Sequence, residues 1–440
     1  MGANYTKLYT DFFMFINSGI QAVIYITFIY YFIISVFGFI RKNEKSAHEY
    51  EPSKSFACIV AAHNEQKVIA NVVDSLLQQH YPKQLFDIYV IADNCSDNTA
   101  QIAAEHGAIV CERANATQRG KGYALEWMFG RIFAMEKKYD AICIFDADNV
   151  VSPDFLPEMN KNFCNGQKIV QGYIDTKNPF DSLTTMFFAI SFWLNNRLVQ
   201  MARYNLGLNC ILCGTGFAVS TDVLKDIGWG ATCLTEDLEF SMKAALNGYK
   251  ITWAHEAVVY DEKPLTLSQS WKQRKRWMQG HSDCIFRFVG ELVNKATRES
   301  SFLAFDCAMY LIQSYIFVVY YASLTVTIAS YIASKGISEA LANAPMKYLS
   351  FILFTTVVGI ITISLDKKLS PKVFLYLFIY PIANLTWIPI IIQGFFDKNK
   401  KEWFHTAHVR NLNINDITSV HRFSFKRKKM AEAKQRAEFS

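Results

Sequence analysis

The chain has 440 residues, of which 51% are hydrophobic, and a formal net charge of only +6. Its Lys and Arg residues gather beside apolar runs, a pattern that suits anionic lipid headgroups and argues against a nucleic-acid-binding surface. The ten cysteines are scattered, several inside apolar stretches, which excludes a secreted disulfide framework and predicts reduced thiols.

The first predicted element is a transmembrane anchor at residues 12–40, a run apolar and long enough to cross a bilayer with tilt. A cleavable signal peptide is the alternative. The run is too long for one, follows Asp11 rather than a basic cluster, and has no small-residue cleavage site after it. Arg41, Lys42 and Lys45 follow the anchor directly, so we expect the N-terminus outside and the next domain in the cytosol.

Residues 54–262 are predicted to form a soluble domain in which apolar runs alternate with helical patterns. The expected strands and helices are 56–61, 66–79, 86–92, 97–106, 122–137 and 141–145, in the order strand, helix, strand, helix, helix, strand. This alternation predicts βαβ units and a parallel sheet, whose strands are apolar throughout because both faces are buried. No GxGxxG sequence follows a strand, so a nicotinamide dinucleotide fold has no support.

Acidic side chains stand where two of these strands end. Asp93 follows one strand, and Asp146 and Asp148 follow another. Ligands of open α/β sheets bind beyond the carboxyl ends of the strands. Two carboxylates separated by one residue suit a hard cation such as Mg²⁺, held together with substrate phosphates. A chance D-x-D sequence is the alternative, and the position directly after a buried strand favours the metal interpretation.

Two later segments each allow two interpretations. The apolar stripe of an amphipathic helix at residues 183–201 either packs in the core or lies in a membrane interface. Before a predicted helix at 238–246, Thr235 is a candidate N-cap whose acidic neighbours oppose the helix dipole. A carboxylate of Glu236 or Asp237 that deprotonates an acceptor hydroxyl is the functional interpretation, and both can hold at once.

Residues 263–300 are predicted to form interfacial helices. Within them, Gln273, Arg276 and Trp277 lie near one helix face, because they are three and four residues apart. Arg pairs bidentately with phosphates, and Trp offers a stacking surface for a sugar ring. The alternative is a basic interfacial helix whose aromatic side chains dip into lipid, and the residues alone leave both interpretations open.

About three further membrane segments are predicted within residues 301–396, namely 302–333, 348–365 and 373–396. Together with the anchor they would leave the C-terminus outside, whereas the basic tail at 397–440 favours the inside. The sequence leaves this conflict open. We assign the tail no role beyond surface electrostatics.

In their order along the chain, these elements resemble the family 2 inverting glycosyltransferases of the membrane-integrated type, which include cellulose, hyaluronan, chitin and poly-N-acetylglucosamine synthases. The resemblance covers residues 55–281. It implies a cytosolic, Rossmann-like catalytic domain of the GT-A type with flanking transmembrane and interfacial helices. One departure is Ala92-Asp93, where many members have two aspartates, so a single carboxylate is left for the nucleotide.

The resemblance also implies roles for individual residues. Asp237 would be the catalytic base. The donor nucleotide-sugar would contact His63, Glu65, Asp93, Lys121, Asp146, Gln273 and Arg276. The acceptor would contact Cys213, Gly214, Thr215, Glu236 and Trp277. Mg²⁺ or Mn²⁺ would be held by Asp146 and Asp148.

The implied reaction moves a sugar with inversion from UDP-N-acetylglucosamine or UDP-glucose to a growing β-linked polysaccharide or oligosaccharide. We expect an integral protein of the plasma membrane. Synthesis of the product can be coupled to its export, and an accessory export subunit is a candidate partner. A non-processive lipid glycosyltransferase of the ceramide-glucosyltransferase kind is the rival interpretation. An inactive membrane scaffold is the rival of another class, and the intact D-x-D, T-E-D and Q-x-x-R-W sequences count against it.

Overall fold

An eight-stranded sheet forms the centre of the soluble domain in the computed structural model, which describes residues 2–230, 232–400, 408 and 410–417. The strand order is β3-β2-β1-β4-β7-β6-β8-β5. The strands are β1 (Phe56–Ala62), β2 (Phe86–Asp93), β3 (Ile109–Arg113), β4 (Ala141–Asp146), β5 (Val150–Val151), β6 (Ile169–Thr176), β7 (Phe217–Ser220) and β8 (Ile251–Asp261).

The sheet is mixed, because two of its strands run against the others. Strands β3, β2, β1 and β4 run parallel, as expected when helices connect them. These crossover helices are α2 (Ile69–Leu77), α3 (Thr99–Glu105) and α4 (Lys121–Ala134). Strand β7 runs antiparallel to both β4 and β6, and β5 runs antiparallel to β8, whereas β6 and β8 pair in parallel. The prediction of a parallel sheet is therefore wrong for β7 and β5. An apolar run predicts a buried strand but carries no information about its direction.

The sheet is buried on both faces, which explains its continuous apolar strands. Along β1, Ile59 faces the core shared with α4, whereas Val60 faces the core shared with α2 and α5 (Phe155–Cys164). Both side chains are fully buried. The carboxyl ends of β1, β2 and β4 meet at one edge of the sheet, where the acidic residues predicted from the sequence follow the strands.

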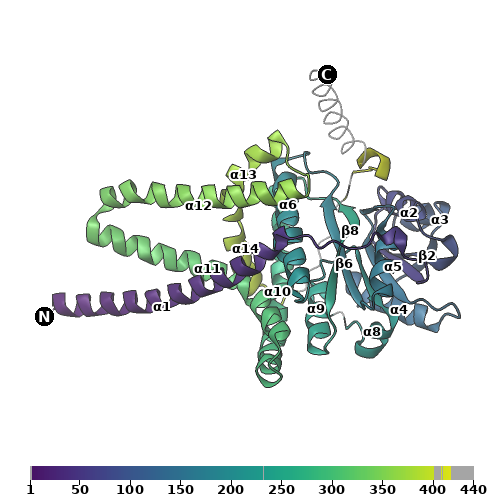
Figure 1. The fold of residues 1–440 in the computed structure, drawn as a ribbon, viewed down its shortest axis with the longest axis horizontal. Helices are drawn as coiled ribbons and strands as arrows, with labels where there is room; N and C mark the ends of the chain where they lie inside the picture. The colour runs from purple at the N-terminus through teal and green to yellow at the C-terminus, as the bar shows by residue number, and fades with distance from the viewer. Residues whose placement is uncertain (1, 231, 401–407, 409, 418–440) are drawn as a thin grey trace, which may run out of the picture.

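A layer of helices separates the sheet from the apolar part of the chain (Figure 1). It contains α6 (Leu183–Asn195), a π-helical stretch (Asn196–Met201), α7 (Ala202–Leu206), α9 (Glu236–Leu246) and α10 (Leu267–Arg298). Helix α8 (Thr221–Ile227) is not part of this layer and contacts β7. Met186 and Ile190 of α6 are buried in the sheet core, whereas Phe187 contacts Tyr376 and Tyr380. The amphipathic stripe therefore packs between the sheet and the apolar helices.

Three long helices extend away from the soluble domain, α1 (Gly2–Val36), α11 (Phe302–Lys335) and α12 (Ile337–Leu365) (Figure 1). Two further helices are α13 (Pro371–Asn384), which packs against α6 and α12, and α14 (Trp387–Phe396), which packs against α10 and α11. By length and composition, the stretches that could cross a membrane are 14–39, 302–335 and 371–396, and 352–365 is a shorter apolar helix.

The segment that follows these helices returns to the soluble domain. Asn71 Nδ2 of α2 donates a hydrogen bond to Asn411 Oδ1 at 2.8 Å, and Ile414 and Ile417 pack against Val150 of β5. Residues 410–417 therefore pack on the soluble domain. Residues 418–440 of the predicted tail lie outside the described residues.

A buried ion pair joins the helix layer to the extended helices. Arg203 Nε of α7 lies 3.1 Å from Asp306 Oδ2 of α11, and both side chains are buried. Tyr30 of α1 donates its hydroxyl to Asp306 Oδ1 at 2.7 Å, so one carboxylate links three helices. Removing one partner of such a pair leaves the other charge buried without compensation.

Replacing Asp306 by Ala should destabilise the protein by about 3–5 kcal/mol, because Arg203 is then left as an unpaired buried charge. The measurement is thermal unfolding of the purified protein in detergent. The double variant Arg203→Met, Asp306→Leu is the control, and it should recover most of the loss because no charge remains. If the double variant is as unstable as the single one, lost packing rather than an unpaired charge is the cause.

Candidate active site

A cavity of about 1030 Å³ opens at the carboxyl ends of β1, β2 and β4 and continues between the apolar helices. Every residue that the sequence singles out for the donor, the acceptor, the metal or the catalytic base lines this cavity. These residues come from strand ends, from two loops and from α9 and α10. The fold therefore brings the whole predicted set together in one place.

At one end of the cavity, the carboxylate of Asp93 is held by an arginine that the sequence did not single out. Arg113 Nη1 donates a hydrogen bond to Asp93 Oδ1 at 2.6 Å, and its Nη2 donates to Gln118 O at 2.8 Å. Arg113 thereby orients the carboxylate and ties the loop after β3 to the end of β2. The two residues are register partners on neighbouring strands, a contact that no local sequence pattern reports.

Lys121 and Asp146 form an ion pair at the centre of the cavity. The Lys121 ammonium contacts Asp146 Oδ1 and donates to Gly214 O at 2.6 Å. Burial would lower the pKa of Lys121, but Asp146 and Glu236 outweigh it and raise the pKa, so the ammonium stays charged. Lys121 thus connects the end of β4 with the 213–215 segment.

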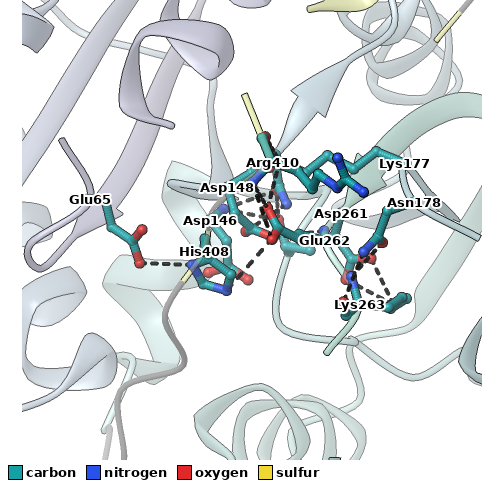
Figure 2. A network of polar contacts seen from close by, with 12 residues as sticks. Glu65, Asp146, Asp148, Lys177, Asn178, Asp261, Glu262, Lys263, His408 and Arg410 are labelled. Carbon is teal, nitrogen blue, oxygen red and sulfur yellow. Dashed lines mark hydrogen bonds and ion pairs between the residues drawn. The ribbon is translucent and has the colours of Figure 1, made fainter. Parts of the chain in front are cut away.

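Asp148 is surrounded by donors and cations (Figure 2). Its Oδ2 accepts a hydrogen bond from Glu262 N at 2.8 Å, and Lys177 Nζ donates to its backbone oxygen at 2.8 Å. His408 Nε2 lies 4.0 Å from the same Oδ2. Burial would raise the pKa of Asp148, but His408 and Lys177 outweigh it, so the net pKa is lowered and the carboxylate stays ionised.

His408 reaches this site from the C-terminal part of the chain. Its Nδ1 lies 2.9 Å from Glu65 Oε1, and Figure 2 shows the imidazole between Glu65 and Asp148. Burial would lower the pKa of His408, but Asp148 and Glu65 raise it to about 9. Nearby, Arg410 N donates to the Glu262 carboxylate at 3.1 Å. The sequence assigned the tail no role beyond surface electrostatics, and His408 is a cavity residue that it did not identify.

The donor set at Asp146 and Asp148 fits a hard divalent cation that binds together with a diphosphate. Such a cation is typically held by one or two carboxylates, with water and substrate phosphates completing its coordination. Among the described residues, no cluster of three or more His, Cys, Asp or Glu side chains could hold a metal alone. The two carboxylates therefore suit a metal that arrives with a substrate better than a closed protein cage.

Asp237 lies in the first turn of α9 and faces the same cavity. Burial and the neighbouring Glu236 carboxylate raise the pKa of Asp237 to about 7, against the opposing effect of Lys121 and Arg276. A carboxylate that titrates near neutral pH is well matched to accepting a proton. Thr235 stands at the N-cap position, but its hydroxyl makes no capping hydrogen bond, so the capping interpretation is wrong for this side chain.

Helix α10 forms the wall opposite the strand ends. Arg276 Nη1 donates to Leu234 O at 3.2 Å, and the Trp277 ring packs edge-on against Phe188 at 6.0 Å. Gln273 Oε1 is buried and has no hydrogen-bond partner among the described residues. Arg274 points the other way and donates to Thr386 Oγ1 at 2.8 Å. The helical spacing thus directs residues 273, 276 and 277 to the cavity.

The cavity also extends to the apolar helices. Thr27 and Tyr31 of α1, and Gln313 and Phe317 of α11, line its far end. Aromatic rings mixed with hydroxyl and amide groups suit a ligand that has both apolar faces and polar edges.

Comparisons with known proteins agree with this geometry. Residues 52–280 match the protein family described as "Glycosyltransferase like family 2". The chain is similar to "Probable glycosyltransferase YdaM" of Bacillus subtilis (strain 168), with 26% identity over 362 residues, 79% of this chain and 83% of that protein. It is also similar to poly-beta-1,6-N-acetyl-D-glucosamine synthase of Staphylococcus epidermidis, with 27% identity over 307 residues, 68% of this chain and 72% of that protein.

A solved structure shares the fold. The mannosyltransferase PcManGT from Pyrobaculum calidifontis, in complex with GDP-Man and Mn²⁺, matches with a TM-score of 0.59 and 17% identity, over 88% of this chain and 99% of that chain. At 17% identity the match shows a shared fold and nothing more. The expectation of a GT-A type α/β domain is confirmed.

Replacing Arg113 by Ala should weaken the binding of a nucleoside diphosphate about tenfold, which corresponds to about 1.4 kcal/mol, because Asp93 loses the partner that orients it. Calorimetric titration of the full chain with UDP measures the effect. The control is Arg131→Ala, which removes an exposed arginine that lies over Trp127 on the outside of α4. Unchanged UDP affinity in the folded Arg113→Ala protein would contradict the orienting role.

Proposed function

We propose that this chain, which belongs to the glycosyltransferase-like family 2, transfers N-acetylglucosamine with inversion from UDP-N-acetylglucosamine to the end of a growing β-linked polysaccharide. One observation carries the proposal: Asp237, the Asp146/Asp148 pair and the Gln273–Trp277 face line a single cavity. The similarity to a poly-beta-1,6-N-acetyl-D-glucosamine synthase supports the choice of sugar.

Asp237 acts as the general base in this reaction. Its carboxylate takes the proton from an acceptor hydroxyl, whose oxygen then attacks the anomeric carbon of the donor sugar. The new carbon–oxygen bond forms as the bond to the diphosphate breaks, and UDP leaves from the opposite face. An α-linked donor therefore gives a β-linked product. With a pKa of about 7, about half of the Asp237 carboxyl groups are ionised at neutral pH, and the group can hold the proton that it accepts.

Cations of the chain face the departing diphosphate. Lys121, the first residue of α4, pairs with Asp146 at the end of β4, and Arg276 projects from α10 into the same cavity. Their fixed positions stabilise negative charge as it develops on UDP, without reorganisation of solvent. A divalent cation held by Asp146 and Asp148 would neutralise a further part of this charge when bound.

The remaining cavity residues bind and orient the two substrates. Asp93, together with His63 and Glu65 on the neighbouring loop, contacts the nucleoside, and Gln273 contributes its unpartnered amide oxygen to the donor side. Trp277 stacks on the terminal sugar of the acceptor. The 213–215 segment and Glu236 hold that sugar's hydroxyl close to Asp237, which converts a bimolecular encounter into a positioned one.

The soluble domain faces the cytosol in this proposal, and the membrane is the plasma membrane. Arg41, Lys42 and Lys45 directly follow α1, and basic residues beside a span favour the inner side. Nucleotide-sugars would then reach the cavity from the cytosol. The described residues offer no feature that bears on an accessory export subunit.

A lipid glycosyltransferase is the second candidate function. The observation in its favour is that the cavity reaches Tyr31 of α1 and Phe317 of α11, where an acceptor with an apolar tail could lie. The two functions differ in product: a polymer in the first case and a single sugar on a lipid in the second. An inactive scaffold is disfavoured because the whole set of charged residues is present in one cavity.

The test is a panel of labelled nucleotide-sugars, supplied with Mg²⁺ or Mn²⁺ to the purified full chain in lipid, with the products sized afterwards. We expect polymer from UDP-N-acetylglucosamine and none from UDP-glucose or GDP-mannose. A single sugar on extracted lipid would replace the first function by the second. Neither function survives if no donor is transferred or hydrolysed.

Replacing Asp237 by Asn should lower turnover by about 10²–10⁴-fold, because the amide cannot accept the acceptor proton. The affinity for UDP-N-acetylglucosamine should stay unchanged, because Asn preserves the shape of the side chain. The matched control is Asp222→Asn, an exposed carboxylate in the first turn of α8. Near-normal turnover in the Asp237→Asn protein would remove this residue from the role of base.

The rate should also depend on pH through Asp237. Its pKa is raised to about 7, so the carboxyl is increasingly protonated below that pH and cannot act as a base. Turnover should therefore fall on acidification, by about tenfold for each pH unit well below the pKa, and level off above it. The measurement is kcat at saturating donor across the neutral and mildly acidic range. A flat profile there would contradict the assignment.

A further inference from the structure

Two cysteine thiols meet beside the catalytic site. The Sγ atoms of Cys233 and Cys284 are 3.8 Å apart. Cys233 belongs to the loop that leads into α9 and Asp237, and Cys284 lies on α10, the helix that carries Arg276. The pair therefore connects the two elements that form opposite sides of the acceptor site.

The two thiols differ in access. Cys233 is partly exposed and lines the cavity, so a small solute that enters the cavity can reach its sulfur. Cys284 is fully buried in a hydrophobic cluster with Ile211, Leu238 and Leu292. One thiol can react first with a solute, and the other is shielded from it but stays close enough to react with the first.

The backbones around the pair are held close together. A Cβ atom built on Gly280 of α10 would lie 2.8 Å from Thr235 N, so the helix touches the loop directly. About two turns further along α10, Arg287 pairs with Glu239 at 2.8 Å, and Glu239 also accepts a hydrogen bond from Cys233 N at 2.9 Å. To form a bond, the two sulfurs must approach from 3.8 Å to about 2.0 Å. The loop and the helix that carry them are already held together by the contacts on either side of the pair.

We propose that Cys233 and Cys284 are a site of reversible oxidation, at which hydrogen peroxide forms a disulfide that shuts down the neighbouring catalytic site. Cytosolic disulfides, where they occur, are mostly of this transient, redox-sensing kind. Hydrogen bonding from the Cys284 thiol lowers the pKa of Cys233 against the effect of burial, and the Thr235 hydroxyl adds to this. A larger thiolate fraction makes Cys233 the attacking sulfur.

The chemistry proceeds in two balanced steps. The Cys233 thiolate attacks one oxygen of hydrogen peroxide, forming a sulfur–oxygen bond as the oxygen–oxygen bond breaks, and hydroxide leaves to be protonated to water. The sulfur of Cys284 then attacks the sulfenic sulfur of Cys233, and a second water leaves with the thiol proton. Two thiols are oxidised by two electrons in total, and one peroxide is reduced to two waters. A dithiol reductant reverses the change.

The disulfide would alter the site because Leu234, the residue after Cys233, contacts α10. Leu234 O accepts the hydrogen bond from Arg276, and Thr235 and Asp237 follow in the same stretch. Drawing the two sulfurs together shifts this stretch relative to α10. The loss of glycosyl transfer rests on the proposed function, whereas the formation of the disulfide does not.

A second cysteine pair in the chain is an internal control. Cys58 of β1 and Cys143 of β4 are register partners on adjacent strands, and both are fully buried in the sheet core. Neither lines the cavity. Because peroxide cannot reach either sulfur, we expect these two thiols to stay reduced under the same treatment, although they are close together.

The experiment treats the purified full chain in detergent with hydrogen peroxide, removes the peroxide, unfolds the protein in the presence of N-ethylmaleimide so that every remaining thiol is blocked, and analyses non-reduced peptides by mass spectrometry. We expect one linked pair of peptides containing Cys233 and Cys284, lighter by two hydrogens and separated again by dithiothreitol. Cys58 and Cys143 should carry the alkyl group. The proposal is overturned if no such link forms, or if Cys58 and Cys143 become linked to the same extent.

Variants and activity complete the test. Cys284→Ser should keep basal transfer within about twofold but form no link, and a dimedone adduct should mark its Cys233 sulfenic acid. In the wild-type protein, peroxide should lower transfer more than about fivefold, with recovery on reduction. If the disulfide forms but glycosyl transfer is unchanged, the disulfide does not control the activity. If the reduced protein transfers no sugar, the proposed function fails, while the peptide masses still decide whether the disulfide forms.

Discussion

The contact between Gly280 of α10 and Thr235 brings a helix and a loop together at backbone distance, and a side chain at position 280 would collide with the loop. On its other side, α10 packs equally closely on α14, where a Cβ atom at Gly394 would lie 2.9 Å from the backbone of Met278. Two glycines thus allow one helix to touch both the catalytic loop and the apolar helices. Arg276 and Trp277 can face the strand ends only because α10 is held in this position.

Charge balance is the second constraint on the site. Five acidic side chains line the cavity around the ends of β2, β4 and β8: Asp93, Asp146, Asp148, Asp261 and Glu262. Carboxylates at such short range would otherwise raise one another's pKa, as burial and Asp148 do for Asp261, whose pKa rises to about 6 despite Lys263. Arg113, Lys121 and Lys177 each form an ion pair with one member of the set. A diphosphate with a divalent cation would therefore enter a site in which acidic and basic side chains are already paired.

Local patterns in the sequence predicted those parts of the fold that depend on near neighbours. The strands β1, β2 and β4 follow from short apolar runs, and the common face of Gln273, Arg276 and Trp277 follows from helical spacing. The antiparallel direction of β7 could not be predicted in this way, because it depends on which strands it pairs with. The same holds for Arg113, which reaches Asp93 only across a strand pair, and for His408, which is 343 residues away from Glu65. Residues that follow a strand directly can be found from sequence, whereas their distant partners require the fold.

The segment that carries His408 also has a consequence for how the protein is made. A domain begins to fold while the chain is still being synthesised, from its N-terminal part onward. The soluble domain is complete in sequence at β8, but His408 and Arg410 leave the ribosome only after α11 to α14 have followed. Until then, Glu65 and Glu262 lack the partners that the finished chain provides. The last side of the cavity is therefore added after membrane insertion, so a nascent chain would carry an incomplete site until its membrane helices are in place.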